Sequence, residues 1–165
     1  MTTATLENPQ TDLYPSRVES EPQLRERRDP IVYGKANDGP LDAAELKDYE
    51  ENGYLTFPGF FNAGELQPYI NELRRLQNDE ATKASPRTIT EPGSGEVRSI
   101  FAIDVHNEVL RAICHHPRLV GIARQLLGGD VYIHQSRINF KPGFKGKEFY
   151  WHSDFETWHV EDGMP

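Results

Sequence analysis

Apolar residues recur at three- and four-residue spacing along the second of two N-terminal stretches, and capping residues precede both, which predicts two helices. Asn62 can cap the second of them, with Glu65 at the position that completes a capping box. Asp42 and Glu45 have the same capping-box spacing, and Gly53 stands where that first helix would stop. The apolar stripe of the second helix consists of Leu66, Tyr69, Ile70, Leu73 and Leu76. We therefore expect one helix that leads to Gly53 and another that begins after Asn62.

The interval 107–127 predicts two further helical pieces. They are broken at His116, because the residue before a proline resists the α conformation, and Gly128 ends the second piece. Runs that alternate or are rich in β-formers predict strands, and the polar stretch 78–96 predicts a loop. The expected strands cover residues 54–61, 97–105, 131–140 and 149–154.

The order of these elements predicts the fold class. Helices come first and strands follow, which indicates an α+β fold whose sheet is still being built at Pro165. Residues 1–40 are rich in Pro, Glu, Arg, Asp and Asn without apolar periodicity, so we expect a mobile N-terminal arm. Residues 41–165 then form the folded part.

Composition narrows the class of protein. The 165 residues are 36% apolar and 27% charged, which is typical of a soluble globular domain. The first ten residues have neither a basic region nor an apolar core, so we expect no secretion signal and no membrane span. A single cysteine, Cys114, agrees with a reducing compartment. We therefore expect a cytoplasmic protein.

The charge of the chain bears on its partners. There are 26 acidic and 18 basic residues, for a formal net charge of -8, and no basic run with interleaved aromatic residues. Nucleic acid, which is held mainly through its phosphates, is therefore not an expected partner.

The segment 149–159 carries the strongest candidate chemistry. It holds two imidazoles and two carboxylates among several aromatic side chains. In an extended strand, residues i and i+2 share a face, so His152 and Asp154 would present an imidazole nitrogen and a carboxylate oxygen to one point. With one further histidine this pair makes the two-His-one-carboxylate triad of iron(II) oxygenases. A helix N-cap and a surface ion pair are the alternatives for so short a motif.

The preceding expected strand adds a polar face. A period of two places Gln135, Arg137 and Asn139 on one side, and their amide and guanidinium groups need partners if they point inward. A solvated sheet face is the alternative. The other side of the same strand carries Tyr132, His134, Ser136, Ile138 and Phe140.

The run 149–165 closely resembles the signature segment of the ectoine hydroxylases. These belong to the phytanoyl-CoA-dioxygenase-like group of iron(II)- and 2-oxoglutarate-dependent dioxygenases. The resemblance extends upstream through residues 135–143 and, more loosely, over residues 42–61. The whole seventeen-residue run is specific, whereas a bare His-x-Asp is not. Residues before position 40 contribute nothing to it.

The resemblance implies a double-stranded β-helix, or jelly-roll, core and a set of site residues. His152 and Asp154 would be two ligands of Fe(II), and the third ligand and an arginine that anchors 2-oxoglutarate are expected beyond Pro165. Phe149 fits strict alternation poorly, since it would lie opposite His152 without a bulge. Contacts to 2-oxoglutarate are implied for Asn139 and Phe149, and contacts to ectoine for Gln135, Arg137, Thr157 and Trp158.

The implied activity is hydroxylation of ectoine to 5-hydroxyectoine, with O2 and oxidative decarboxylation of 2-oxoglutarate to succinate and CO2. Such a reaction belongs to compatible-solute biosynthesis under osmotic stress. Arg137 could offer a fork of donors to the ectoine carboxylate, and Trp158 an aromatic face to its amidinium. A homodimer is compatible with the resemblance. With the third ligand absent, we expect the 165-residue chain to be inactive alone.

Two other functions remain open on the sequence. One is a related hydroxylase that acts on another small zwitterion or an amino acid. The other is a non-catalytic metal- or solute-binding β domain that uses His152, Asp154 and His159. The last is disfavoured because residues seven apart on an extended chain stand about 23 Å apart.

Overall fold

The computed structural model describes residues 26, 30–141, 150–152 and 154. The chain divides into two units, one of residues 29–147 and one that joins residues 1–28 to 148–165. The helices and strands described below belong to the 29–147 unit, and each unit is described by itself.

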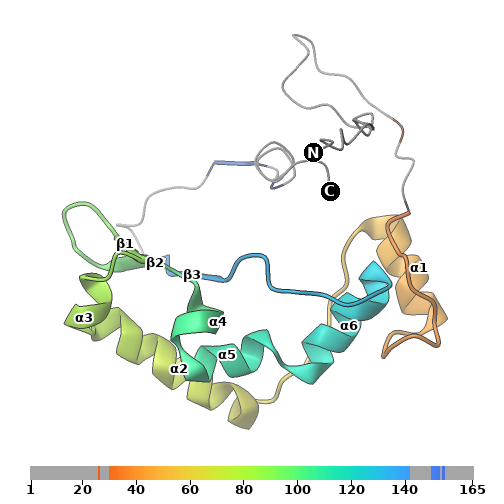
Figure 1. Ribbon diagram of the computed structural model, residues 1–165, viewed down its shortest axis with the longest axis horizontal. Coiled ribbons are helices and arrows are strands. Elements are labelled where there is room, and N and C mark those ends of the chain that lie inside the picture. The colour runs from red at the N-terminus through yellow and green to blue at the C-terminus, as the bar shows by residue number, and fades with distance from the viewer. Residues whose placement is uncertain (1–25, 27–29, 142–149, 153, 155–165) are drawn as a thin grey trace, which may run out of the picture. The chain divides into compact units, whose positions relative to one another are not determined.

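The 29–147 unit is mixed α and β (Figure 1). Its helices are α1 (Ala43–Asn52), α2 (Ala63–Asn78), α3 (Glu80–Lys83), α4 (Ile103–His106), α5 (Glu108–Cys114) and α6 (Pro117–Leu127). Its strands are β1 (Thr88–Thr90), β2 (Val97–Phe101) and β3 (Arg137–Asn139).

The helix boundaries follow local capping chemistry. Asp42 and Asn62 both close capping boxes, each with a glutamate at the third helical position. Gly53 and Gly128 end α1 and α6 in the left-handed conformation, with φ of 76° and 68°. The predicted break at His116 is confirmed, and the His116 side chain additionally caps α6 by accepting a hydrogen bond from the Arg118 amide.

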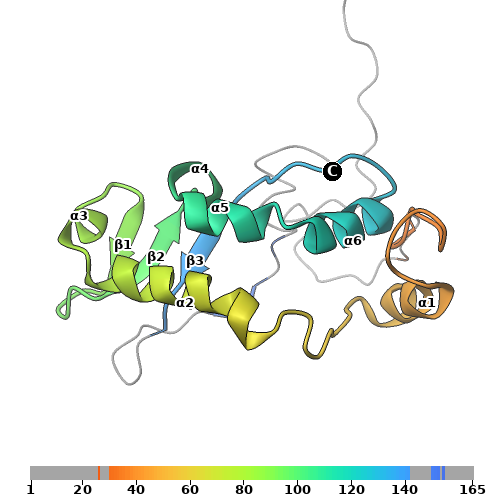
Figure 2. The same ribbon diagram turned by 90° about the horizontal axis from the view of Figure 1, so that it is seen from below.

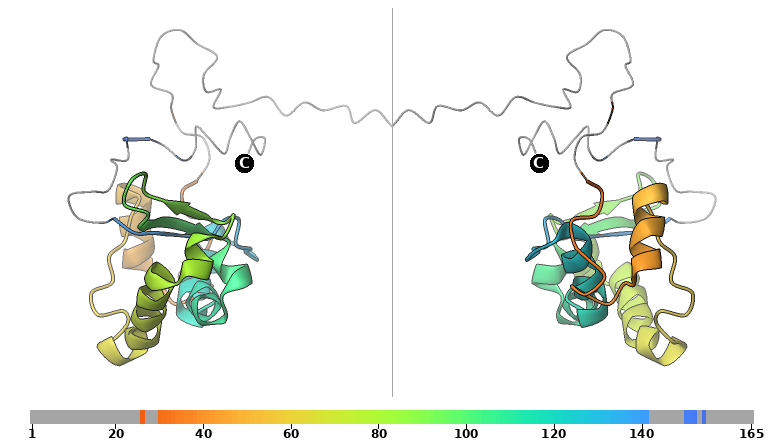
Figure 3. Two further views of the ribbon diagram at one scale, coloured as in Figure 1. Left: turned by 90° about the vertical axis from the view of Figure 1, so that its left-hand side faces the viewer. Right: turned by 90° about the vertical axis from the view of Figure 1, so that its right-hand side faces the viewer.

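The three strands form an antiparallel sheet in the order β1-β2-β3. In β2 and β3, Ser99 stands opposite Asn139, Ile100 opposite Ile138 and Phe101 opposite Arg137. Helices α2, α4 and α5 lie on one side of this sheet (Figures 1 and 3). The side of the sheet that the helices cover therefore carries apolar residues of the strands, and the other side can carry polar residues.

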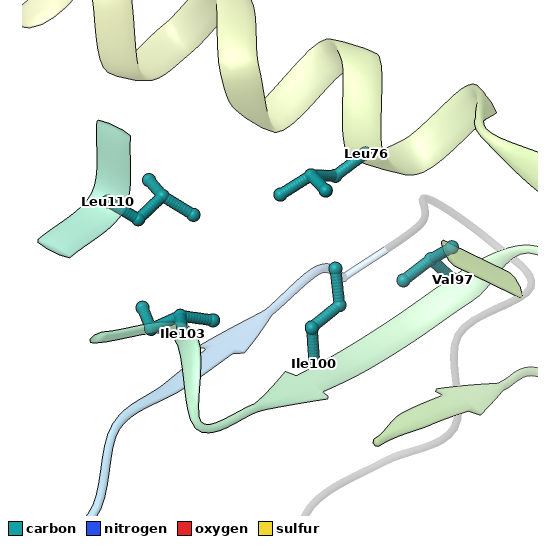
Figure 4. Close-up of a cluster of buried hydrophobic side chains, with 5 residues drawn as sticks. All are labelled: Leu76, Val97, Ile100, Ile103 and Leu110. Carbon is teal, nitrogen blue, oxygen red and sulfur yellow. The ribbon is translucent and has the colours of Figure 1, made fainter. Parts of the chain in front are cut away.

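The hydrophobic core fills the space between these helices and the sheet. Figure 4 shows its side chains converging from α2, β2, α4 and α5. Half-buried residues, including Ile138 and Phe140, pack around this cluster. The buried members are Leu76, Val97, Ile100, Ile103 and Leu110. The stripe predicted for α2 is thus confirmed as core at Leu76, with Tyr69 and Leu73 beside it, whereas its member Ile70 is exposed.

A second packing centre holds residues 30–41 beside α1 and α6 (Figure 2). Gln125 on α6 is 1% exposed, and its side-chain Oε1 atom accepts a hydrogen bond of 2.7 Å from the Leu41 backbone amide. Its side-chain Nε2 atom donates to the backbone carbonyls of Lys35 and Leu41, at 2.9 and 2.8 Å. Most of the predicted arm, residues 1–40, lies outside the described residues, but its segment 30–40 is anchored by these bonds.

The strand predicted over residues 54–61 is wrong. Residues 54–57 lie outside any strand, and a turn at Pro58 and Gly59 follows, with the Phe60 amide donating to the Phe57 carbonyl at 3.2 Å. The aromatic residues that favoured a strand pack on one another instead: the Phe57 and Phe60 rings are 5.3 Å apart and the Phe60 and Phe61 rings 4.9 Å. These aromatic residues, which usually indicate a strand, are thus packed locally in a turn and not against a neighbouring strand.

The other strand predictions hold only in their centres. The stretch 78–96 contains α3 and β1 as well as loops, and the strand predicted over 97–105 ends at Phe101. The strand predicted over 131–140 is reduced to Arg137–Asn139, because pairing with β2 is confined to that interval. Residues 150–152 are not in a strand, and Asp154 is helical. Alternation alone could not reveal where a partner strand is available.

No helix among the described residues is long and apolar enough to cross a membrane.

Replacing Gln125 by alanine should destabilise the protein by about 2–4 kcal/mol, because it strands the buried backbone groups that the side chain satisfies. Urea denaturation measures the change. The control is Gln67→Ala, which removes an exposed bond to Asn71 on α2 and should cost under about 0.5 kcal/mol. Similar losses for both variants would contradict a special role for Gln125.

The free energy of unfolding should also depend on pH through Glu72, which links α2 to the N-cap of α5. Bonds from the Arg75 guanidinium and the Asn107 amide lower the pKa of this carboxyl despite its burial. Because the pKa of Glu72 is lowered in the folded protein, its ionised carboxylate stabilises the fold fully above pH 4.5, the ordinary value. This stabilisation is lost as the pH falls through the lowered pKa. Glu72→Gln should therefore flatten the fall in unfolding free energy between about pH 6 and pH 3. The exposed Glu80→Gln change is the control, and an unaltered slope in Glu72→Gln would refute the role.

Candidate functional site

The polar face predicted on β3 is present. Gln135, Arg137 and Asn139 are exposed, whereas Ser136, Ile138 and Phe140 are half-buried on the helix-covered side. The period of two is thus confirmed over residues 135–140. This polar face is the side of the sheet that α2, α4 and α5 leave open.

The spacing of backbone bonds brings the polar residues close to β2. The Phe140 amide donates to the Arg98 carbonyl, and the Ala102 amide donates to the Ser136 carbonyl, both at 2.8 Å. The intervening pairs, Ser99 with Asn139 and Phe101 with Arg137, are therefore of the non-hydrogen-bonded kind. In such pairs the side chains approach most closely.

Each of these two pairs makes a specific contact. The Arg137 guanidinium carbon lies 5.6 Å from the centre of the Phe101 ring, within range of a cation–π interaction. The Ser99 hydroxyl donates to the Asn139 side-chain oxygen at 2.8 Å. Both polar residues of β3 are thus supported from β2, and among the described residues the Arg137 fork and the Asn139 amide nitrogen have no hydrogen-bond partner.

A compact turn fixes the start of β3. Ala102, between β2 and α4, has φ of 54°, a left-handed conformation that is strained for a residue with a side chain. Its amide bonds the Ser136 carbonyl, and the Ser136 hydroxyl accepts from the Asp104 amide at 3.2 Å and donates to the Asp104 carboxylate. These bonds hold the residue before Arg137 against α4.

In the other unit, His152 and Asp154 approach one another. The His152 Nε2 atom is 3.6 Å from the Asp154 Oδ1 atom, and both side chains are exposed, at 57% and 79%. The His152 Nδ1 atom is 2.7 Å from the Tyr150 carbonyl oxygen. Because a carbonyl only accepts, Nδ1 must be the protonated nitrogen in this bond.

This geometry fits two ligands of a single metal ion. With Nδ1 donating to the Tyr150 carbonyl, Nε2 and the Asp154 carboxylate oxygen are the two atoms that a cation between them would bind. Histidine ligands in metal sites commonly donate their other ring N–H to a backbone carbonyl, as His152 does here. The chemistry of one imidazole and one carboxylate suits iron(II). Within the described residues, no group of three or more His, Cys, Asp or Glu gathers to hold a metal.

The structure leaves several site predictions untested. The Gln135, Arg137 and Asn139 face and the His152–Asp154 pair belong to different units, so their predicted proximity stays a prediction. The residues Phe149, Thr157, Trp158 and His159 lie outside the described residues. The two histidines between α5 and α6 have structural roles: His115 Nδ1 donates to the Arg111 carbonyl, and His116 caps α6.

Ser99 and Phe101, which support the polar face, were not predicted as site residues from the sequence. They occupied a predicted strand, but their importance depends on which residues stand opposite. The antiparallel register pairs them with Asn139 and Arg137, forty and thirty-six positions away along the chain. A correct alignment of the two predicted strands would have been the signal.

Comparison with known proteins is consistent with this arrangement. The ectoine dioxygenase of Stutzerimonas stutzeri is 53% identical over 157 residues, covering 94% of this chain and 52% of that protein. The ectoine dioxygenase of Streptomyces avermitilis is 49% identical over 156 residues, covering 94% of this chain and 52% of its own length. The chain thus spans about half the length of the curated relatives that it matches.

Solved structures match the fold. The crystal structure of EctD from S. alaskensis with bound Fe has a TM-score of 0.86 and 47% identity, covering 93% of this chain and 55% of that one. A structure of the same protein with 2-oxoglutarate and 5-hydroxyectoine has a TM-score of 0.85 over the same coverage. The helices and small antiparallel sheet described above therefore have a counterpart in EctD. Since the phytanoyl-CoA dioxygenase family matches residues 49–165, which is most of the sequence, this chain belongs to that family.

Proposed function

We propose that this chain is part of an ectoine hydroxylase dependent on Fe(II), 2-oxoglutarate and O2. The reaction would yield 5-hydroxyectoine, succinate and CO2 for compatible-solute biosynthesis. The observation that carries the proposal is the His152–Asp154 pair, with its nitrogen and oxygen donors 3.6 Å apart and the imidazole oriented by the Tyr150 carbonyl. Its family supplies the context in which such a pair acts.

The relatives support the substrate and the cosubstrate. Those described above are named ectoine dioxygenase, and the EctD structure contains 2-oxoglutarate and 5-hydroxyectoine. Because this chain spans about half of their length, their activity is an argument for the proposal rather than a property of the chain.

His152 and Asp154 would hold the iron, which supplies the oxidation chemistry when it is bound. The Tyr150 carbonyl accepts from Nδ1 and so leaves Nε2 as the ring nitrogen that would bind the metal. The Asp154 carboxylate would bring the negative charge that a divalent cation requires and would take the position that a halide ligand needs. This favours hydroxylation over halogenation.

The open sheet face would bind the small molecules. Asn139, with Phe149, would contact 2-oxoglutarate, and Arg137 would receive the ectoine carboxylate. The Phe101 ring beneath the Arg137 guanidinium limits the orientations of that long side chain, which reduces the entropy lost on binding. The remaining wall residues, Gln135, Thr157 and Trp158, would complete the ectoine contacts, with Trp158 against the amidinium.

The wider architecture follows the same proposal. We place a jelly-roll core over residues 41–165 and expect its strands to extend the β1-β2-β3 sheet, with residues 1–40 as an N-terminal arm. A cytoplasmic, homodimeric enzyme is the form we propose for the whole protein, with neither nucleic acid nor membrane among its partners.

Succinate release tests the function. The chain is completed to the length of its relatives with the C-terminal part of the Stutzerimonas stutzeri protein and supplied with Fe(II), 2-oxoglutarate and O2. We expect succinate to form in step with 5-hydroxyectoine, and only when ectoine is present. Succinate formed with another zwitterion or amino acid, but not with ectoine, would indicate a related hydroxylase. Metal binding without any succinate would indicate a non-catalytic domain.

In the same completed protein, Asp154→Ala should abolish hydroxylation, because it removes the charged iron ligand. Trp158→Ala should mainly raise the KM for ectoine, by about tenfold if it removes one desolvated cation–π contact. The matched control is Asp130→Ala, which removes an exposed carboxylate paired with Arg124 and should leave turnover unchanged. Near-normal ectoine turnover by Asp154→Ala would refute the ligand assignment.

A further inference from the structure

Ser99 is a buried polar residue at the centre of the open sheet face. It is 3% exposed, although it stands on the side of the sheet that carries the exposed residues Arg137 and Asn139. Its hydroxyl donates to the Asn139 side-chain oxygen at 2.8 Å, across a pair in which the two strands bring side chains closest. The small Ser99 side chain therefore touches the functional part of Asn139.

This bond decides which way the Asn139 amide faces. An asparagine side chain has an oxygen that only accepts and a nitrogen that only donates, at nearly equivalent positions. If the amide were reversed, its nitrogen would donate to Ser99 Oγ, and the hydroxyl hydrogen would need another acceptor. Among the described residues, the Asn139 oxygen is the acceptor that this hydroxyl has. Leaving a buried donor without a partner is costly, so the observed orientation is favoured.

We propose that Ser99 is a positioning residue that keeps the Asn139 Nδ2 donors directed to the open side of the sheet, where they select a carboxylate ligand. This inference rests on the proposed function, in which that carboxylate belongs to 2-oxoglutarate. An amide free to rotate would present its oxygen in part of the population, and an oxygen repels a carboxylate. Arg137, two residues away on the same face, adds a positive charge that favours the same class of ligand.

The two supports on β2 differ in kind. Phe101 supports Arg137, which presents a positive charge in every rotamer. Ser99 supports Asn139, whose amide attracts or repels a carboxylate depending on which way it is rotated. The bond from Ser99 therefore controls specificity, and its loss should affect 2-oxoglutarate rather than ectoine. A purely structural role would instead lower stability and leave the two KM values in proportion.

The first test needs no catalysis. In an isotopically labelled sample of the 165-residue chain, nuclear Overhauser effects are measured between the Asn139 Nδ2 hydrogens and the Ser99 β-hydrogens. We expect weak effects, because the oxygen rather than the nitrogen faces Ser99. Strong effects would show the reversed amide and overturn the proposal, whether or not the completed protein is an ectoine hydroxylase.

The second test uses the completed protein. Ser99→Ala should raise the KM for 2-oxoglutarate about fivefold, the worth of one net hydrogen bond, with little change in the KM for ectoine. Ser99→Thr, which keeps the hydroxyl and suits a strand, should restore it. In an Asn139→Ala background, Ser99→Ala should have no further effect, as a double-mutant cycle requires of an indirect role.

These outcomes separate the two hypotheses. A parent protein that forms no succinate defeats the proposed function, and the Asn139 orientation is then decided by the first test. A parent that is active, with equal KM values in Ser99→Ala and Ser99→Thr or an undiminished effect in the Asn139→Ala background, overturns the role of Ser99 alone.

Discussion

The antiparallel pairing of β2 with β3 is the constraint from which the organisation of the 29–147 unit follows. Because side chains alternate across a strand, the pairing turns Ile100 and Ile138 into the core and Arg137 and Asn139 to the open face. A shift of the register by one residue would reverse both assignments. The apolar cluster under α2, α4 and α5 resists such a shift, since it would expose buried residues. The same strand register thus determines both the packing of the core and the residues of the polar face.

Much of the helical part could be predicted because its signals are local. Asp42 with Glu45, and Asn62 with Glu65, act within one turn, and Gly128 ends α6 through its own backbone freedom. Strands depend on partners that are remote in sequence. Residues 54–61 carry good strand formers, yet their rings pack in a turn, and β3 extends only as far as β2 accompanies it. For the same reason the role of Ser99 could not be predicted, because it depends on Asn139, forty positions away along the chain.

The site residues divide along a similar line. Alternation correctly placed Gln135, Arg137 and Asn139 on one face, since one strand suffices for that inference. The approach of His152 to Asp154 was also expected, but not the route: residues 150–152 are not in a strand, and the Tyr150 carbonyl orients the imidazole. The metal role of the pair and its proximity to the polar face stay predictions, which are based on family membership and on chemistry.

A common device links the two groups that matter most. An imidazole and a primary amide can each present either a donor or an acceptor at the same position, so neither has a defined preference for a ligand by itself. In His152 the Nδ1–H donates to a backbone carbonyl, which leaves Nε2 for a ligand and suits a cation. In Asn139 a buried hydroxyl occupies the oxygen and leaves N–H donors, which suit an anion. Fixed neighbours thus give the two side chains opposite ligand preferences, which are the preferences that the proposed metal and carboxylate cosubstrate would require.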